Sequence, residues 1–268
     1  MGDINPIPLA FRVLAAITLA VLLVPVMLVV LAGLNSGDYL TFPPEGLSLR
    51  WIRTFLTSPT FMPAFLFSFG LAAATTVVST LLGTMAAVFL TRSTWKGKEL
   101  LRGLFILPVV LPGVVVGLAL YVFYIWTGSE LARTFPGLLI GHVLVTMPFV
   151  IATVSASLVD FDPSLEEAAR SLGASPLQAF FKVTLPVISP GISAGTIFAF
   201  IISFGQFELT LFLAPADRQP LPLAIYTSLR YAFEPTAAAA GIFAICLVVL
   251  STLLSSRLLN LRKLLARR

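Results

Sequence analysis

Six continuous apolar runs dominate this chain and limit what it can fold into. Each has about 20 residues or more, the helical length that crosses a hydrocarbon core of about 30 Å. They fall near residues 11–33, 63–90, 103–126, 136–158, 190–213 and 236–257. A transmembrane β-barrel would instead alternate apolar and polar residues in segments of about ten. The sequence therefore predicts an all-α integral membrane protein with six transmembrane helices.

The composition agrees with an embedded chain. Of its 268 residues, 58% are hydrophobic and only 11% are charged. The first run is longer than the apolar region of a signal peptide, about 7–15 residues, and has no convincing cleavage site, so we expect a retained helix. With no internal repeat and no soluble domain, we expect a single transmembrane domain over residues 1–268.

Lysine and arginine placement predicts the orientation. The chain has 17 of these residues, and twelve fall on the side of the two termini. The five on the opposite side are Arg50, Arg53, Arg133, Arg218 and Arg230. Because basic loops stay cytoplasmic, we expect both termini in the cytoplasm. The basic tail after Ser256 is then an anchor near anionic lipid rather than a nucleic-acid-binding segment, and we expect no nucleic acid partner.

A polar segment, residues 159–189, interrupts the apolar pattern between the fourth and fifth runs. Asp162 can cap a first short helix, and Gly173 can end it in a left-handed turn. Residues 175–178 read Ser-Pro-Leu-Gln, a capping box that opens a second helix with proline at its first position. The sequence thus predicts two short helices set at an angle to each other.

This polar segment is too charged to lie within a bilayer. A charged side chain costs about 2.5–3.5 kcal/mol at the bilayer centre on insertion scales. The segment carries five such residues: Asp162, Glu166, Glu167, Arg170 and Lys182. We therefore expect it to lie outside the membrane, on the cytoplasmic side.

The polar segment also contains a spaced motif. Glu167-Ala168-Ala169 is followed after three residues by Gly173, and after nine more by Val183-Thr184-Leu185-Pro186. The set resembles the cytoplasmic signature of permease subunits of binding-protein-dependent ABC importers, with valine in place of isoleucine. The likeness covers roughly residues 60–256, and residues 220–240 resemble the last outer loop of the spermidine/putrescine branch.

The resemblance implies a type I permease fold with six helices and a cytoplasmic two-helix coupling loop, in a bacterial inner membrane. It also implies several partners: two copies of an ABC ATPase, a second permease that is a related rather than an identical chain, an external solute-binding protein and membrane lipid. The residues that we expect to contact the ATPase are Glu166, Glu167, Ala168, Ala169, Gly173, Leu177, Phe180, Phe181, Leu185 and Pro186. The apolar stripes among them have a second interpretation, in which they pack on the protein's own membrane helices.

No catalytic, cofactor or metal site is predicted in this chain. A phosphate-binding loop of the form G-x-x-x-x-G-K-[ST] does not occur in the sequence. We therefore expect ATP and Mg²⁺ to bind the partner ATPase. Cys246 is the only cysteine and His142 the only histidine, which leaves no cluster for a metal. His142 is interpreted as a hydrogen-bonded packing residue in preference to a proton relay.

Polar residues of the fifth run are candidates for the substrate path. In a regular helix Ser203, Gln206 and Thr210 share one face, while Glu208 is rotated by about 200° from Gln206 unless Gly205 loosens the turn. Glu208 could face the path, or it could pair with Arg218 or Arg230. Two further candidates, Tyr121 and Tyr124, line either an outer vestibule or the aromatic belt of the membrane.

The transported solute stays open at this stage. In the polyamine branch the fifth span carries an acidic pair where this chain has Gly205-Gln206, so a polyamine competes with an amino acid derivative, an opine or an aminophosphonate. The alternative function is a secondary transporter or channel that needs no ATPase. Such a protein would show inverted repeats and charged relays in mid-membrane, and the sequence shows neither clearly.

Overall fold

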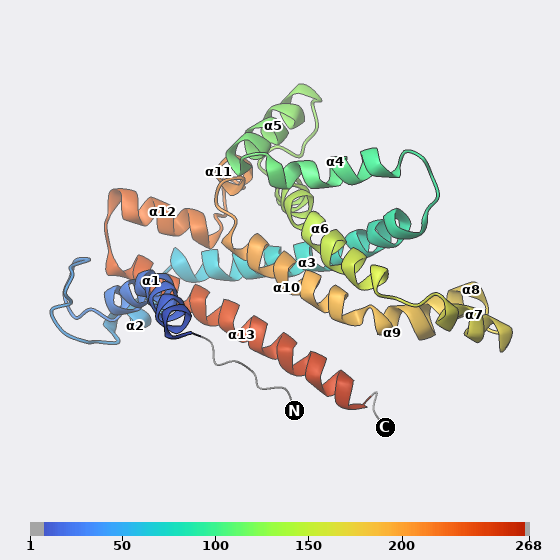
Figure 1. Ribbon diagram of the computed structural model, residues 1–268. Coiled ribbons are helices and arrows are strands. Elements are labelled where there is room, and N and C mark those ends of the chain that lie inside the picture. The colour runs from blue at the N-terminus through green and yellow to red at the C-terminus, as the bar shows by residue number, and fades with distance from the viewer. Residues whose placement is uncertain (1–7, 266–268) are drawn as a thin grey trace. The chain divides into compact units, whose positions relative to one another are not determined.

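The computed structural model describes residues 8–265. Every regular element in this range is helical, with one isolated bridge between Asn35 and Leu47, so the all-α prediction is confirmed. The helices in chain order are α1 (Leu9–Gly33), α2 (Arg50–Thr57), α3 (Phe61–Arg92), α4 (Lys98–Val110), α5 (Gly113–Trp126), α6 (Phe135–Val159), α7 (Ser164–Ser171), α8 (Pro176–Ala179), η1 (Phe180–Thr184), α9 (Leu185–Val187), α10 (Ser189–Gly205), α11 (Thr210–Leu213), α12 (Leu221–Tyr231) and α13 (Pro235–Leu265) (Figure 1).

Contacts divide the chain into two compact units. One unit holds residues 8–62 and 225–247, and the other holds residues 63–224 and 248–265. Part of the basic tail, Arg267 and Arg268, lies outside the described residues.

In the smaller unit, α1 packs on the first turns of α13 through small residues. A side chain at Gly33 would come within 2.9 Å of the Ala239 backbone nitrogen, so glycine permits this approach of two backbones. Short α2 adds aromatic packing, because the Phe55 ring stacks on Phe243 with centroids 4.4 Å apart. The rest of α1 is exposed and apolar, as expected of a helix that faces lipid or another chain.

In the larger unit, α6 is the central helix. One core cluster joins its second half to α3 and α10, and includes Leu90, Val154, Ile188 and Ala199. Glycines allow the close packing: a side chain at Gly195 of α10 would lie 2.9 Å from the Val150 Cα of α6. Small residues of this kind set the distances between helices in membranes. Lipid tails are as apolar as the side chains, so helix association there depends on close packing and not on the hydrophobic effect.

Four helical stretches are long and apolar enough to cross a membrane, namely α1, α3, α6 and residues Pro235–Leu253 of α13. Two bent helix pairs raise the number to six if each is one span. Helices α4 and α5 meet at 108° around Leu111-Pro112, and the run Pro176–Val187 meets α10 at 68°. Proline explains the first bend, since Pro112 offers no backbone donor and disfavours a helical residue before it.

The fifth apolar run is also interrupted. Helix α10 ends at Gly205, Gln206 is extended, and helix resumes only at Thr210. The sequence permits a loosened turn at Gly205, and the structure has a complete break there.

Candidate functional site

The first helix of the polar segment, α7, begins and ends with the predicted signals. The Asp162 carboxylate accepts a hydrogen bond from the Ser164 backbone N–H at 2.9 Å, which satisfies a free donor of the first turn. At the other end Gly173 has φ of +92°. The Gly173 N–H donates to the Arg170 carbonyl and the Ala174 N–H to the Ala169 carbonyl. Together these two bonds form the Schellman motif.

The second helix opens with the predicted capping box. The Ser175 hydroxyl accepts from the Gln178 N–H at 3.3 Å, and the Gln178 side chain accepts from the Ser175 N–H at 3.0 Å. The helix then widens into the π-turn η1, where the Leu185 N–H donates to the Phe180 carbonyl five residues back. Pro186 accounts for this change, because it has no N–H to continue the α-helical pattern.

One side of the polar segment exposes apolar side chains. Leu172 is 90% exposed and Leu177 68%, while Leu165 is 45% exposed. Among the predicted contact residues, Glu167, Ala168 and Pro186 are also exposed, and Ala169 is half-buried. A helix too polar for lipid that presents leucines in this way has the surface of a protein-docking site.

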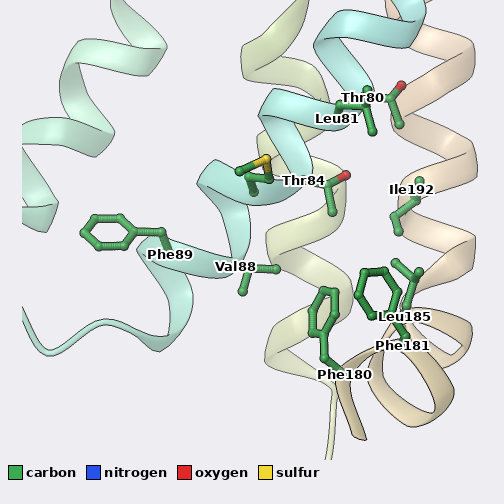
Figure 2. A pocket seen from close by; sticks show the side chains of 10 residues that line it. Thr80, Leu81, Thr84, Val88, Phe89, Phe180, Phe181, Leu185 and Ile192 are labelled. Carbon is green, nitrogen blue, oxygen red and sulfur yellow. The ribbon is translucent and has the colours of Figure 1, made fainter. Parts of the chain in front are cut away.

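Another part of the polar segment faces α3 across an apolar cavity of about 650 Å³. Phe180, Phe181 and Leu185 line it from η1 and α9, and Thr84 and Val88 line it from α3 (Figure 2). The Phe180 and Phe181 rings meet edge to face at 5.4 Å. These three side chains thus lie toward the protein's own membrane helix α3, while Phe181 is also 55% exposed.

Glu166 is also turned inward. The Glu166 carboxylate accepts a hydrogen bond from Nη1 of Arg92, which is the last residue of α3. This nitrogen lies 3.0 and 3.1 Å from the two carboxylate oxygens. The carboxylate also accepts a hydrogen bond from the Thr184 hydroxyl. Arg92 is not among the predicted site residues, because a pair of residues 74 positions apart leaves no local signal in the sequence.

Two of the predicted path residues lie together in the core instead of along an open face. Buried His142 of α6 is 2.8 Å from the Ser203 hydroxyl through Nδ1 and 3.2 Å from the Thr210 hydroxyl through Nε2. Thr210 donates its own proton to the Gln206 carbonyl at 2.7 Å. Thr210 must then accept from Nε2–H, and Nδ1 accepts from Ser203.

The other two predicted path residues of the fifth run lie around its break. Gln206 is half-buried and Glu208 is exposed. The Glu208 carboxylate lies so close over Gly113, at the start of α5, that a side chain there would overlap it. One turn later a side chain at Gly117 would come within 2.9 Å of the Leu209 Cα. Two glycines of α5 therefore form the seat for residues 208–209.

The two candidate tyrosines differ in setting. Tyr124 is buried and donates a hydrogen bond to the Gly137 carbonyl at 3.2 Å, so it joins α5 to α6. Tyr121 is half-buried, with the Arg133 guanidinium 5.8 Å from its ring centroid. No group of three or more metal-ligating side chains occurs in the part of the chain that the structure describes.

Comparisons with known proteins agree with this geometry. Residues 79–264 match the family described as binding-protein-dependent transport system inner membrane component. The putrescine transport system permease protein PotI of Escherichia coli is 31% identical over 216 residues, 79% of this chain and 76% of PotI. The molybdenum transport system permease protein ModB of Haemophilus influenzae is 34% identical over 189 residues, 65% of this chain and 82% of ModB.

A solved structure shares the fold. It is that of a bacterial alginate ABC transporter in complex with an alginate pentasaccharide-bound periplasmic protein. A chain of it superposes with a TM-score of 0.70 and 18% identity, over 91% of this chain and 92% of that chain.

The fold and the polar segment define a multi-pass helical membrane permease. The chain belongs to the inner membrane components of binding-protein-dependent transport systems, the permease subunits of ABC importers. In this family the ATPase is a separate subunit.

Proposed function

We propose that the polar segment docks on a cytoplasmic ABC ATPase and conveys its ATP-driven movement to the membrane helices. The exposed leucines of α7 and α8 carry this proposal. A solvated pair of helices that exposes Leu172, at the end of the first, and Leu177, in the second, by more than two-thirds needs a protein partner. Gly173 sets the angle between the two helices, so both halves can enter one groove. ATP and Mg²⁺ would then bind the partner and not this chain.

The proposal extends to the remaining partners and to the membrane topology. Residues 1–268 would form one transmembrane domain with both termini in the cytoplasm, paired with a second permease to form the pore. For this second permease we favour a related chain over an identical copy, because the sequence resembles the spermidine/putrescine branch. An external binding protein would deliver the solute to the outer loops, and transport would proceed by alternating access.

Co-purification with the ATPase tests the docking surface. When the importer subunits are expressed together, we expect the ATPase to copurify with the wild-type chain and to be lost with Leu172→Ser. Leu100→Ser is the matched control, because Leu100 is 72% exposed but lies in α4, outside the polar segment. Equal recovery of the ATPase with both variants, or solute uptake by this chain with no ATPase present, would contradict the proposal.

For the solute we propose a small organic molecule: a polyamine, an amino acid derivative, an opine or an aminophosphonate. Similarity to PotI supports a polyamine. The sequence of the fifth run weakens that assignment, because Glu208 is its one carboxylate and an organic dication favours several carboxylates or aromatic faces. Uptake of labelled putrescine by the complete importer separates these classes. Uptake supports a polyamine, and no uptake favours the other three.

A further inference from the structure

Arg92 joins the end of α3 to three places in or beside the polar segment. Its Nη1 atom binds Glu166 of α7, and its Nη2 atom lies 3.5 Å from the Thr184 hydroxyl of η1. Its guanidinium carbon lies 5.6 Å from the centroid of the Phe161 ring, at the entry to the segment. Phe161 and Thr184 are buried. One side chain thus holds both helices of the segment and its first turn.

This ion pair differs from the others in the described part of the chain. The remaining three pairs are Arg50–Asp38, Arg102–Glu99 and Arg218–Asp217, and each joins residues at most 12 positions apart with side chains at least 44% exposed. In the Arg92–Glu166 pair the side chains are 35% and 22% exposed. Partial burial reduces the screening that makes exposed pairs weak. This pair is therefore a tertiary link between a membrane helix and the polar segment.

Apolar packing between the same two elements is incomplete. The cavity of about 650 Å³ separates Phe180 and Phe181 from the last turns of α3 (Figure 2). The chain itself connects the segment only to α6 and α10, its neighbours in sequence. Movement of the segment reaches those two helices through the backbone. It reaches α3 directly through the polar contacts of Arg92, because the cavity leaves the apolar packing there incomplete. A second, indirect route is the core cluster that α3 shares with α6 and Ile188.

We propose that Arg92 is a positioning residue that conveys displacement of the polar segment to α3. This inference rests on the proposed docking of the ATPase to the segment. Loss of the Arg92 contacts would leave ATPase docking intact, since Arg92 binds Glu166 and Thr184 and the exposed Leu172 and Leu177 are not among its contacts. It would instead separate ATP hydrolysis from the movement of α3.

Distance measurements between spin labels on α3 and α6 test this directly. In a Cys246→Ser background, Leu66→Cys and Ile140→Cys place the two labels at exposed positions. The complete importer is measured without nucleotide and after trapping with ATP and vanadate. We expect ATP trapping to shift the distance distribution with Arg92 present. We expect Arg92→Gln to reduce this shift while the ATPase still copurifies to within about twofold.

Three further variants sharpen the result. Arg102→Gln removes an arginine from an exposed pair and should behave as wild type. Arg92→Lys keeps the charge without the fork that reaches two acceptors, and should give an intermediate shift. Arg92→Glu combined with Glu166→Arg should regain part of the shift. An unchanged shift in Arg92→Gln, or no shift with Arg92 present, overturns the inference. Loss of the ATPase from the wild-type complex would instead overturn the proposed function.

Discussion

At the scale of single residues, Ser203 holds the His142 ring in place from the end of α10. We expect Ser203→Ala to lower the free energy of unfolding by about 1–3 kcal/mol, because a buried ring nitrogen loses its hydrogen-bond partner. Thermal unfolding in detergent measures this loss. Ser251→Ala is the matched control, since that hydroxyl donates only to the Val248 carbonyl of its own helix. Equal unfolding temperatures for the two variants would show that the His142 contact contributes nothing.

Gly173 occupies a backbone conformation that other residues resist. With φ of +92°, alanine there should destabilise the turn by about 1 kcal/mol or more, whereas asparagine tolerates left-handed geometry better. We expect Gly173→Ala to reduce recovery of the ATPase more than Gly173→Asn does. No heavy atom lies within 4 Å of an added side-chain carbon at this position, so crowding would not explain the difference. Equal recovery with both variants would refute the backbone explanation.

At the scale of elements, the start of α7 should depend on pH. The hydrogen bond from the Ser164 N–H keeps the pKa of the Asp162 carboxyl below its ordinary value. A lowered folded-state pKa means that the cap stabilises α7 fully above about pH 4, the ordinary value, and is lost as the pH falls through the folded pKa. We expect amide exchange in the first turn of α7 to be faster in Asp162→Ala at neutral pH. In Asp162→Asn, which keeps an acceptor, protection should persist without the acid dependence.

The contact between α5 and the break in the fifth run requires glycine. A methyl group at Gly117 would meet backbone atoms of Leu209, which cannot rotate away. We expect Gly117→Ala to lower the free energy of unfolding by about 1–3 kcal/mol. Gly103→Ala, in α4 with open space around it, should be neutral or slightly stabilising. A neutral Gly117→Ala would mean that the two elements separate without cost.

Local signals predicted local structure well. The Asp162 cap, the Gly173 turn and the Ser175–Gln178 capping box each depend on neighbours within a few residues, and each is present. Pro112 and Pro186 are local signals for the bend and the π-turn, but they do not set the angle of 108° between α4 and α5. The length of the break after Gly205 has no local signal either. The Arg92–Glu166 pair and the His142 contacts likewise bring together residues that are 61 to 74 positions apart. A single sequence holds no record of such pairs.

At the scale of the whole molecule, the side of the membrane on which each loop lies can be measured. In a Cys246→Ser background we expect Thr127→Cys to react with a membrane-impermeant maleimide in intact cells. Ser171→Cys should react only after permeabilisation, which also confirms that the position is accessible. Labelling of Ser171→Cys in intact cells would reverse the orientation that lysine and arginine placement predicts.

The bend between α4 and α5 and the break after Gly205 leave main-chain amides and carbonyls without helical partners inside two predicted spans. Hydrocarbon does not tolerate such groups, so irregular backbone at this depth has to be enclosed by protein or bathed by water. The seat that Gly113 and Gly117 provide brings the start of α5 against residues 208–209, beside the break. Lipid must therefore be kept away from this junction in the working importer.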